Sequence, residues 1–74
     1  MALSEKEKLA IGETVLAIIS VAILSGISRK QGAVAFAVAA EITQEIERNP
    51  TIEDSLGVEM LKAIIDKEAE RIGL

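Results

Sequence analysis

Apolar residues recur along the first third of the chain with the spacing of an α-helix. Ser4 and Glu7 match the S-x-x-E capping box, which predicts that this helix begins at Ser4 and runs to about Ile27. Two apolar stripes cover more than half of its circumference: Leu9, Leu16, Ile19 and Ile23 form one, and Ile11, Val15, Ile18 and Ala22 form the other. The pattern therefore predicts a helix that is buried on nearly every side.

The apolar pattern breaks after this helix, and two boundaries for the next helix compete. Ser28 with Gln31 matches a second capping box, which would start the second helix at once. Alternatively, Arg29 and Lys30 close the first helix, where cations suit the negative end of the helix dipole, and Gly32 follows as its C′ residue. The placement of the two cations favours the second boundary. With either boundary the turn is short, which predicts an antiparallel helical hairpin.

The second helix is expected from about Ala33 to Arg48. Its apolar residues fall at i, i+4 spacing: Val34, Val38, Ile42 and Ile46. Asn49 and Pro50 end it, because a residue before proline is pushed out of helical geometry.

A third, amphipathic helix is expected to end at Ile72. It carries a one-sided apolar stripe, with Gly57 dividing off a short first turn or helix. Gly73 followed by Leu74 predicts a Schellman ending. The stripe consists of Leu61, Ile64, Ile65 and Ile72.

The first helix has more apolar surface than the other two helices can cover in a chain of 74 residues. We therefore expect an all-α single domain (residues 1–74), a helical hairpin plus a third helix, completed by homo-oligomerisation. A dimer with a four-helix core is the simplest assembly. The residues expected at the oligomer interface are Leu16, Ile19, Ile23, Val34, Val38 and Ile42.

Lipid is the alternative cover for the first helix. Residues 14–28 carry no charge, and extending the segment to residues 9–28 reaches the length of about 20 apolar residues that a bilayer requires, but takes in Glu13. The acidic second half of the second helix forbids a return through the membrane. A membrane-active small protein, holin-like or peptide-like, is therefore ranked second.

Composition removes most catalytic chemistry. The chain has no Cys and no His, so disulfides, thiolate metal sites and His-assisted nucleophiles are excluded. The remaining Ser–Lys pairing lacks a desolvated lysine. We expect no enzymatic activity, no cofactor and no metal.

Charge and the first residues bear on partners and location. A net charge of −4 argues against a nucleic-acid partner. The alternating Glu and Lys near the start do not form a secretion signal, which makes a cytoplasmic location the default.

Three charged features have sharper interpretations that we rank below ordinary ones. Glu41 and Glu45 lie one helical turn apart, as metal ligands can, but a solvated face with Arg48 as a partner is expected. Glu13 is expected to reach water, or a basic partner such as Arg29 of another copy, rather than to act as a buried acid. Arg29 and Lys30, at the turn between the first two helices, are expected to be solvated rather than to bind an anion.

One segment resembles the turn of a helix-turn-helix. Residues 51–58 would form the turn and residues 59–66 the recognition helix. That helix offers two acids and one Lys, which suits a DNA groove poorly. The leading prediction is therefore a non-enzymatic structural or interaction protein, such as an assembly component, adaptor or inhibitor. Its partners are further copies of itself and, as a second possibility, another protein.

Overall fold

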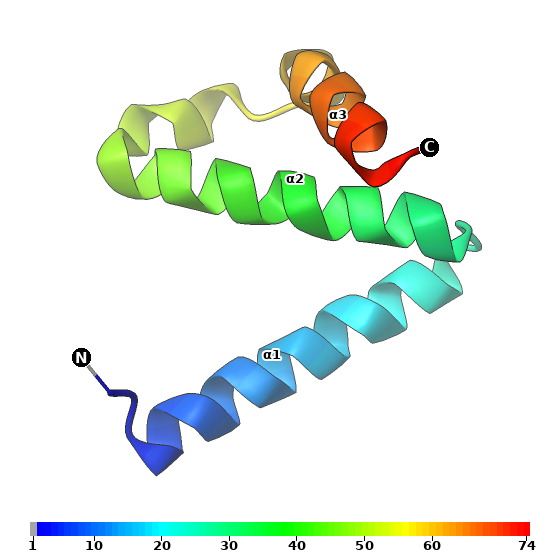
Figure 1. Ribbon diagram of the computed structural model, residues 1–74. Helices are drawn as coiled ribbons and strands as arrows, with labels where there is room; N and C mark the ends of the chain where they lie inside the picture. The colour runs from blue at the N-terminus through cyan, green and yellow to red at the C-terminus, as the bar shows by residue number, and fades with distance from the viewer. Residues whose placement is uncertain (1) are drawn as a thin grey trace.

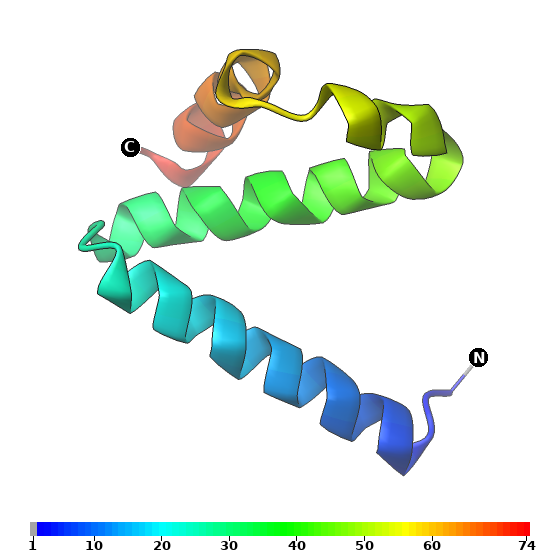
Figure 2. The same ribbon diagram turned by 180° about the vertical axis from the view of Figure 1, so that it is seen from behind.

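The computed structural model describes residues 2–74, and all of its regular elements within that range are helical. α1 spans Glu5–Leu24 and α2 spans Arg29–Arg48. The short 3₁₀ helix η1 (Pro50–Ser55) follows, and then α3 (Val58–Ile72). α1 and α2 diverge from their connecting turn as the two arms of a V, while α3 crosses the opposite side of α2 (Figures 1 and 2).

The start of α1 is as predicted, and its end comes earlier. The Ser4 side chain accepts from the backbone N–H of Glu7, and the Glu7 side chain accepts from the N–H of Ser4. The helix stops at Leu24, and Gly26 adopts a φ of 74°, in the left-handed region that favours glycine. The segment proposed for membrane insertion, residues 9–28, is therefore not one continuous helix.

The favoured boundary between the first two helices is wrong. Ser28 caps α2, with both hydrogen bonds of the capping box formed with Gln31. Arg29 and Lys30 thus lie in the first turn of α2 rather than in the last turn of α1. The box satisfies two backbone groups at the helix start, which outweighs the small unfavourable interaction of cations with that end of the helix dipole. Gly32 is buried inside α2 and is not a C′ residue.

The boundaries of α3 follow the sequence. Gly57 separates η1 from α3, as expected. At the end of α3, Gly73 takes a φ of 89° and its N–H donates to the carbonyl of Glu70. The N–H of Leu74 donates to the carbonyl of Ala69, which completes the predicted Schellman motif.

The core lies between α2 and α3. Val34, Val38 and Ile42 are 5%, 5% and 7% exposed, because the apolar stripe of α3 covers them. The partly buried residues around these three are Ile46, Met60, Leu61, Ile64, Ile65, Ala69 and Ile72.

α1 takes no part in this core. No residue of α1 is buried in the single chain, so the burial on nearly every side that the sequence predicts stays a prediction for an assembly. The hairpin is splayed, so α2 covers only the part of α1 near the turn (Figure 1). Within residues 2–74, no helix combines the length and the apolar character that crossing a membrane requires.

Candidate interaction groove

An apolar groove runs between the two arms of the V. It contains two hollows of about 490 Å³ and 370 Å³, the smaller one next to the turn. Ile19 from α1 and Phe36 from α2 line both hollows. We refer to the residues around the two hollows as the α1–α2 groove.

The α2 wall of the groove consists mainly of small side chains around one aromatic ring, and Arg29 and Gln44 also line it. Ala39, Ala40 and Thr43 line the larger hollow with Phe36, and Gly32 lines the smaller one. The Thr43 hydroxyl donates to the carbonyl of Ala39 at 2.7 Å, so this wall presents no unsatisfied hydroxyl. Small side chains allow the backbone of another helix to approach closely.

The α1 wall is apolar and largely open. Val15, Ile18 and Ile19 line the larger hollow, and all three side chains are exposed. Ile23 lines the smaller hollow and is 72% exposed, and Leu16, on a neighbouring face of the same helix, is 66% exposed. Single exposed apolar residues are common on protein surfaces, but a whole helix of them is unusual for a monomer.

The structure separates the six predicted interface residues into two groups. Val34, Val38 and Ile42 lie in the chain's own core, beneath α3, and present almost no surface to a second copy. Leu16, Ile19 and Ile23 remain on the surface of α1. Of the six predicted residues, only the three on α1 are therefore accessible to a partner.

Sequence reasoning did not assign Phe36, Ala39 and Ala40 to the interface. A signal was present, because Phe36 is the only aromatic residue of the chain and lies within an alanine-rich segment. The i, i+4 stripe of α2 was assigned to partners instead, although α3 needs that stripe for its own burial.

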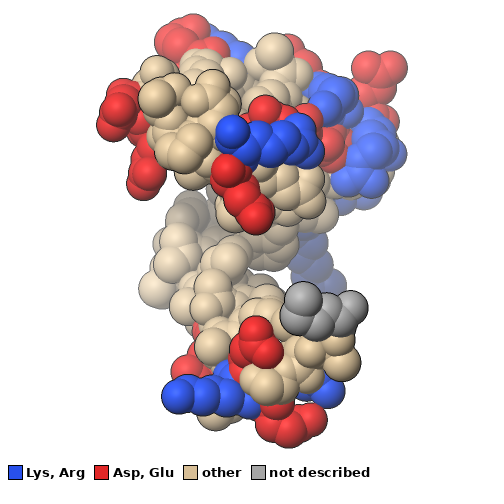
Figure 3. All heavy atoms as spheres, turned by 90° about the vertical axis from the view of Figure 1, so that its left-hand side faces the viewer, with Lys and Arg blue, Asp and Glu red and all other residues tan. Residues whose placement is uncertain are grey.

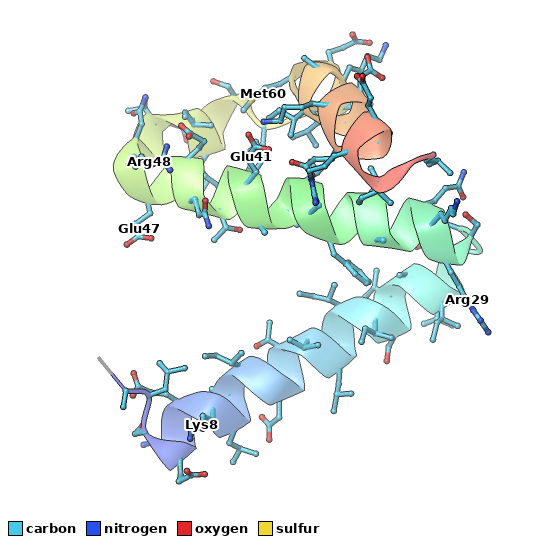
Figure 4. All side chains as sticks on the ribbon, in the orientation of Figure 1. Lys8, Arg29, Glu41, Glu47, Arg48 and Met60 are labelled. Atoms are coloured by element: carbon cyan, nitrogen blue, oxygen red, sulfur yellow. The ribbon has the colours of Figure 1, made fainter. Side chains whose placement is uncertain are left out.

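Charged residues surround the groove rather than fill it. The space-filling view in Figure 3 shows acidic and basic side chains gathered on the α2–α3 body and around the N-terminal end of α1, with an uncharged waist between them. Glu47 projects from α2 near the open end of the V, and Lys8 lies near the start of α1. Arg29 lies where the two arms of the V meet (Figure 4). The length of the groove between these ends is apolar.

The acidic pair that was considered as metal ligands is engaged with cations. Glu41 accepts a hydrogen bond from Lys67 of α3, and Glu45 accepts one from Arg48 in the same helix. The Lys67 hydrogen bond lowers the pKa of Glu41, and the same bond raises the pKa of Lys67. Among residues 2–74, no group of three or more His, Cys, Asp or Glu side chains is arranged to hold a metal ion.

The remaining charged candidates lie on the surface. Glu13 is exposed, and by the helical period it lies on the opposite side of α1 from Ala22, which lines the groove. Glu68 is the one buried charged residue in the part of the chain that the structure describes, and it accepts from Arg71 at 2.7 Å.

The resemblance to a helix-turn-helix does not extend to the structure. Most of the segment expected as the turn, residues 51–58, belongs to the 3₁₀ helix η1. On the segment that would enter a DNA groove, Leu61, Ile64 and Ile65 are packed against the core.

Comparison with protein-family models, with curated proteins and with solved structures found no match to this chain.

Proposed function

We propose that this chain is a non-enzymatic structural or interaction protein that works as a self-associated assembly, with α1 as the element through which copies meet. The observation that carries the proposal is the uncovered state of α1. One further copy with matching apolar surface would cover it. A cytoplasmic location belongs to the same proposal.

The exposed area of the single chain supports a missing partner. The chain exposes 5974 Å² at a mass of 7.9 kDa. A compact monomer of this mass exposes about 4,400 Å², so the excess is about 1,500 Å². A standard interface removes about 800 Å² from each partner, which makes the excess large enough for a stable association.

The dimensions of the chain support the same conclusion. Its radius of gyration is 13.8 Å. A compact domain of this length has a radius of about 11.3 Å. The chain is extended because α1 stands away from the α2–α3 body (Figure 2), and large apolar side chains of α1 are exposed to solvent.

Light scattering on the purified protein tests the proposal. We expect a molar mass that is a multiple of 7.9 kDa at micromolar concentration. Detergent-free fractionation of cells that express the chain separates this proposal from the membrane alternative. Recovery in the membrane pellet would favour a lipid-bound protein, and a monomer in solution would leave α1 without the proposed cover.

A further inference from the structure

We infer that the α1–α2 groove is the receptor for α1 of a second copy, so that two chains interlock with each α1 seated in the V of the other. This inference rests on the proposed self-association and specifies its geometry. It predicts that α1 of one copy meets two helices of its partner at once, α1 and α2.

A helix inserted between two arms must be apolar on two adjoining faces, and α1 fulfils this condition. Its groove-facing stripe includes Val15, Ile18 and Ala22. Leu16 lies on the next face, with Ile19 and Ile23 between the two faces by the helical period of about 100° per residue. Ile23 also lines the smaller hollow. α2 and α3 do not qualify, because the apolar stripe of each is already used in the core.

The polar side chains in the middle of α1 do not prevent burial. The Thr14 hydroxyl donates to the carbonyl of Ala10, and the Ser20 hydroxyl donates to that of Leu16, both at 2.9 Å. Because both hydroxyls are satisfied within the helix, covering them leaves no donor without an acceptor. Glu13 is the one charge in this part of α1, and its position opposite the groove-facing stripe leaves it in solvent.

The α2 wall is shaped for a closely packed helix. Gly32, Ala39 and Ala40 project little from the helix, and Phe36 borders both hollows as the one large apolar side chain of this wall. The large aliphatic residues of an incoming α1 can fill the hollows on either side of that ring. Complementarity between a small-residue wall and a helix of large aliphatic residues favours α1 over a second α2 in this position.

The exchange is reciprocal, as two-fold symmetry requires, because each chain offers one groove and one α1. If each copy hides its excess of about 1,500 Å², the pair buries about 3,000 Å² in total, which is in the range of obligate homodimers. A side-by-side pair that used only the face of α1 pointing away from the groove would leave both grooves open.

Cross-linking between single-cysteine variants tests the interlocked geometry, since the chain has no native Cys. Leu16→Cys places a thiol on α1, and Ala39→Cys places one on the α2 wall of the groove. Both positions are exposed in the single chain, so the folded structure tolerates them. The two variants are mixed and equilibrated, treated with a short bismaleimide, and analysed by mass spectrometry of the linked peptides. Ala63→Cys, on the exposed face of α3, replaces Ala39→Cys as the matched control.

The interlocked dimer predicts a peptide that links position 16 of one copy to position 39 of the other. In the Ala63→Cys control it predicts no peptide that links position 16 to position 63. If sedimentation shows a dimer but position 16 links only to position 16 or to position 63, the interlocked geometry is overturned while the proposed self-association stands. If the variants sediment as monomers without a cross-link, both are overturned. A monomer that floats with phospholipid vesicles would likewise overturn both and identify lipid as the occupant.

Discussion

Ile19 on α1 and Phe36 on α2 face the same apolar space from opposite walls of the α1–α2 groove. Each lines both hollows of the groove, so these two side chains mark its centre. Ile19 is exposed in the single chain and lies in the groove, so its environment changes if a second copy enters. This relationship makes position 19 the most informative site for separating association from folding.

Ile19→Asp should weaken association without unfolding the α2–α3 body. In the single chain the new carboxylate would reach water, but in the covered groove it would be an unpaired charge in a desolvated position. Such a charge costs about 3–5 kcal/mol. The dissociation constant should therefore rise roughly a hundredfold to several thousandfold, measured by sedimentation equilibrium.

Ala63→Asp provides the control, because it introduces the same charge at an exposed position of α3. This variant should associate like the original chain. Equal weakening by both variants would mean that added negative charge, rather than the groove, explains the effect.

Ile42→Ala should destabilise the α2–α3 core. Ile42 is buried beneath α3 and belongs to the small cluster of buried core residues. Removing its side chain should lower the free energy of unfolding by about 2–5 kcal/mol, measured by urea denaturation. Val58→Ala, which truncates an exposed apolar residue of α3, should have little effect. Similar losses for the two variants would contradict the placement of the core.

Lys30→Glu should stabilise the chain slightly. Lys30 lies in the first turn of α2, which contains no acidic residue, so a carboxylate there replaces an unfavourable dipole interaction with a favourable one. The expected gain is about 0.5 kcal/mol, and Lys30→Gln should give an intermediate value. If thermal unfolding showed a loss for Lys30→Glu, the boundary at Ser28 would be in question.

The hydrogen bond between Lys67 and Glu41 should make stability depend on pH. The lowered pKa of Glu41 means that its contribution is fully present above the ordinary carboxyl value of 4.5 and is lost as the pH falls through the folded-state pKa. The raised pKa of Lys67 means that its contribution is present below 10.5 and is lost as the pH rises through the folded-state pKa. Both side chains are partly exposed, so salt should weaken the effect.

Lys67→Met tests this dependence. The variant should show a smaller loss of stability than the original chain between neutral pH and pH values below 4.5. Lys62→Met is the matched control, because Lys62 pairs with Glu59 within α3 and joins no second helix. A pH profile of Lys67→Met that coincides with that of the original chain would contradict the assigned role of the α2–α3 ion pair.

The sequence predicts the elements well where a local signal decides them. The capping box at Ser4, the break at Asn49 and Pro50 and the Schellman motif at Gly73 are confirmed, because each depends on hydrogen bonds or sterics within a few residues. The boundary at Ser28 was missed because two local signals compete there. The hydrogen bonds of the capping box stabilise the helix start at Ser28 more than the two cations, which favour the C-terminal end of a helix dipole, destabilise it.

The site was harder to predict, because it depends on which apolar face is covered by which helix. The i, i+4 stripe of α2 reads equally well as an oligomer interface and as a core, and only the position of α3 decides that it is core. The excess apolar surface of α1 was visible in its sequence. The splayed position of α1 was not, because nothing in the local pattern sets the angle between α1 and α2 across the turn that contains Gly26.

Amide hydrogen exchange of α1 as a function of protein concentration tests the central claim most directly. At concentrations where the assembly forms, the amides of residues 9–24 should be strongly protected, and dilution should remove this protection while the amides of α2 and α3 keep theirs. This result would show that a second copy covers α1. Protection of α1 that is unchanged by dilution, in a particle of 7.9 kDa, would contradict it.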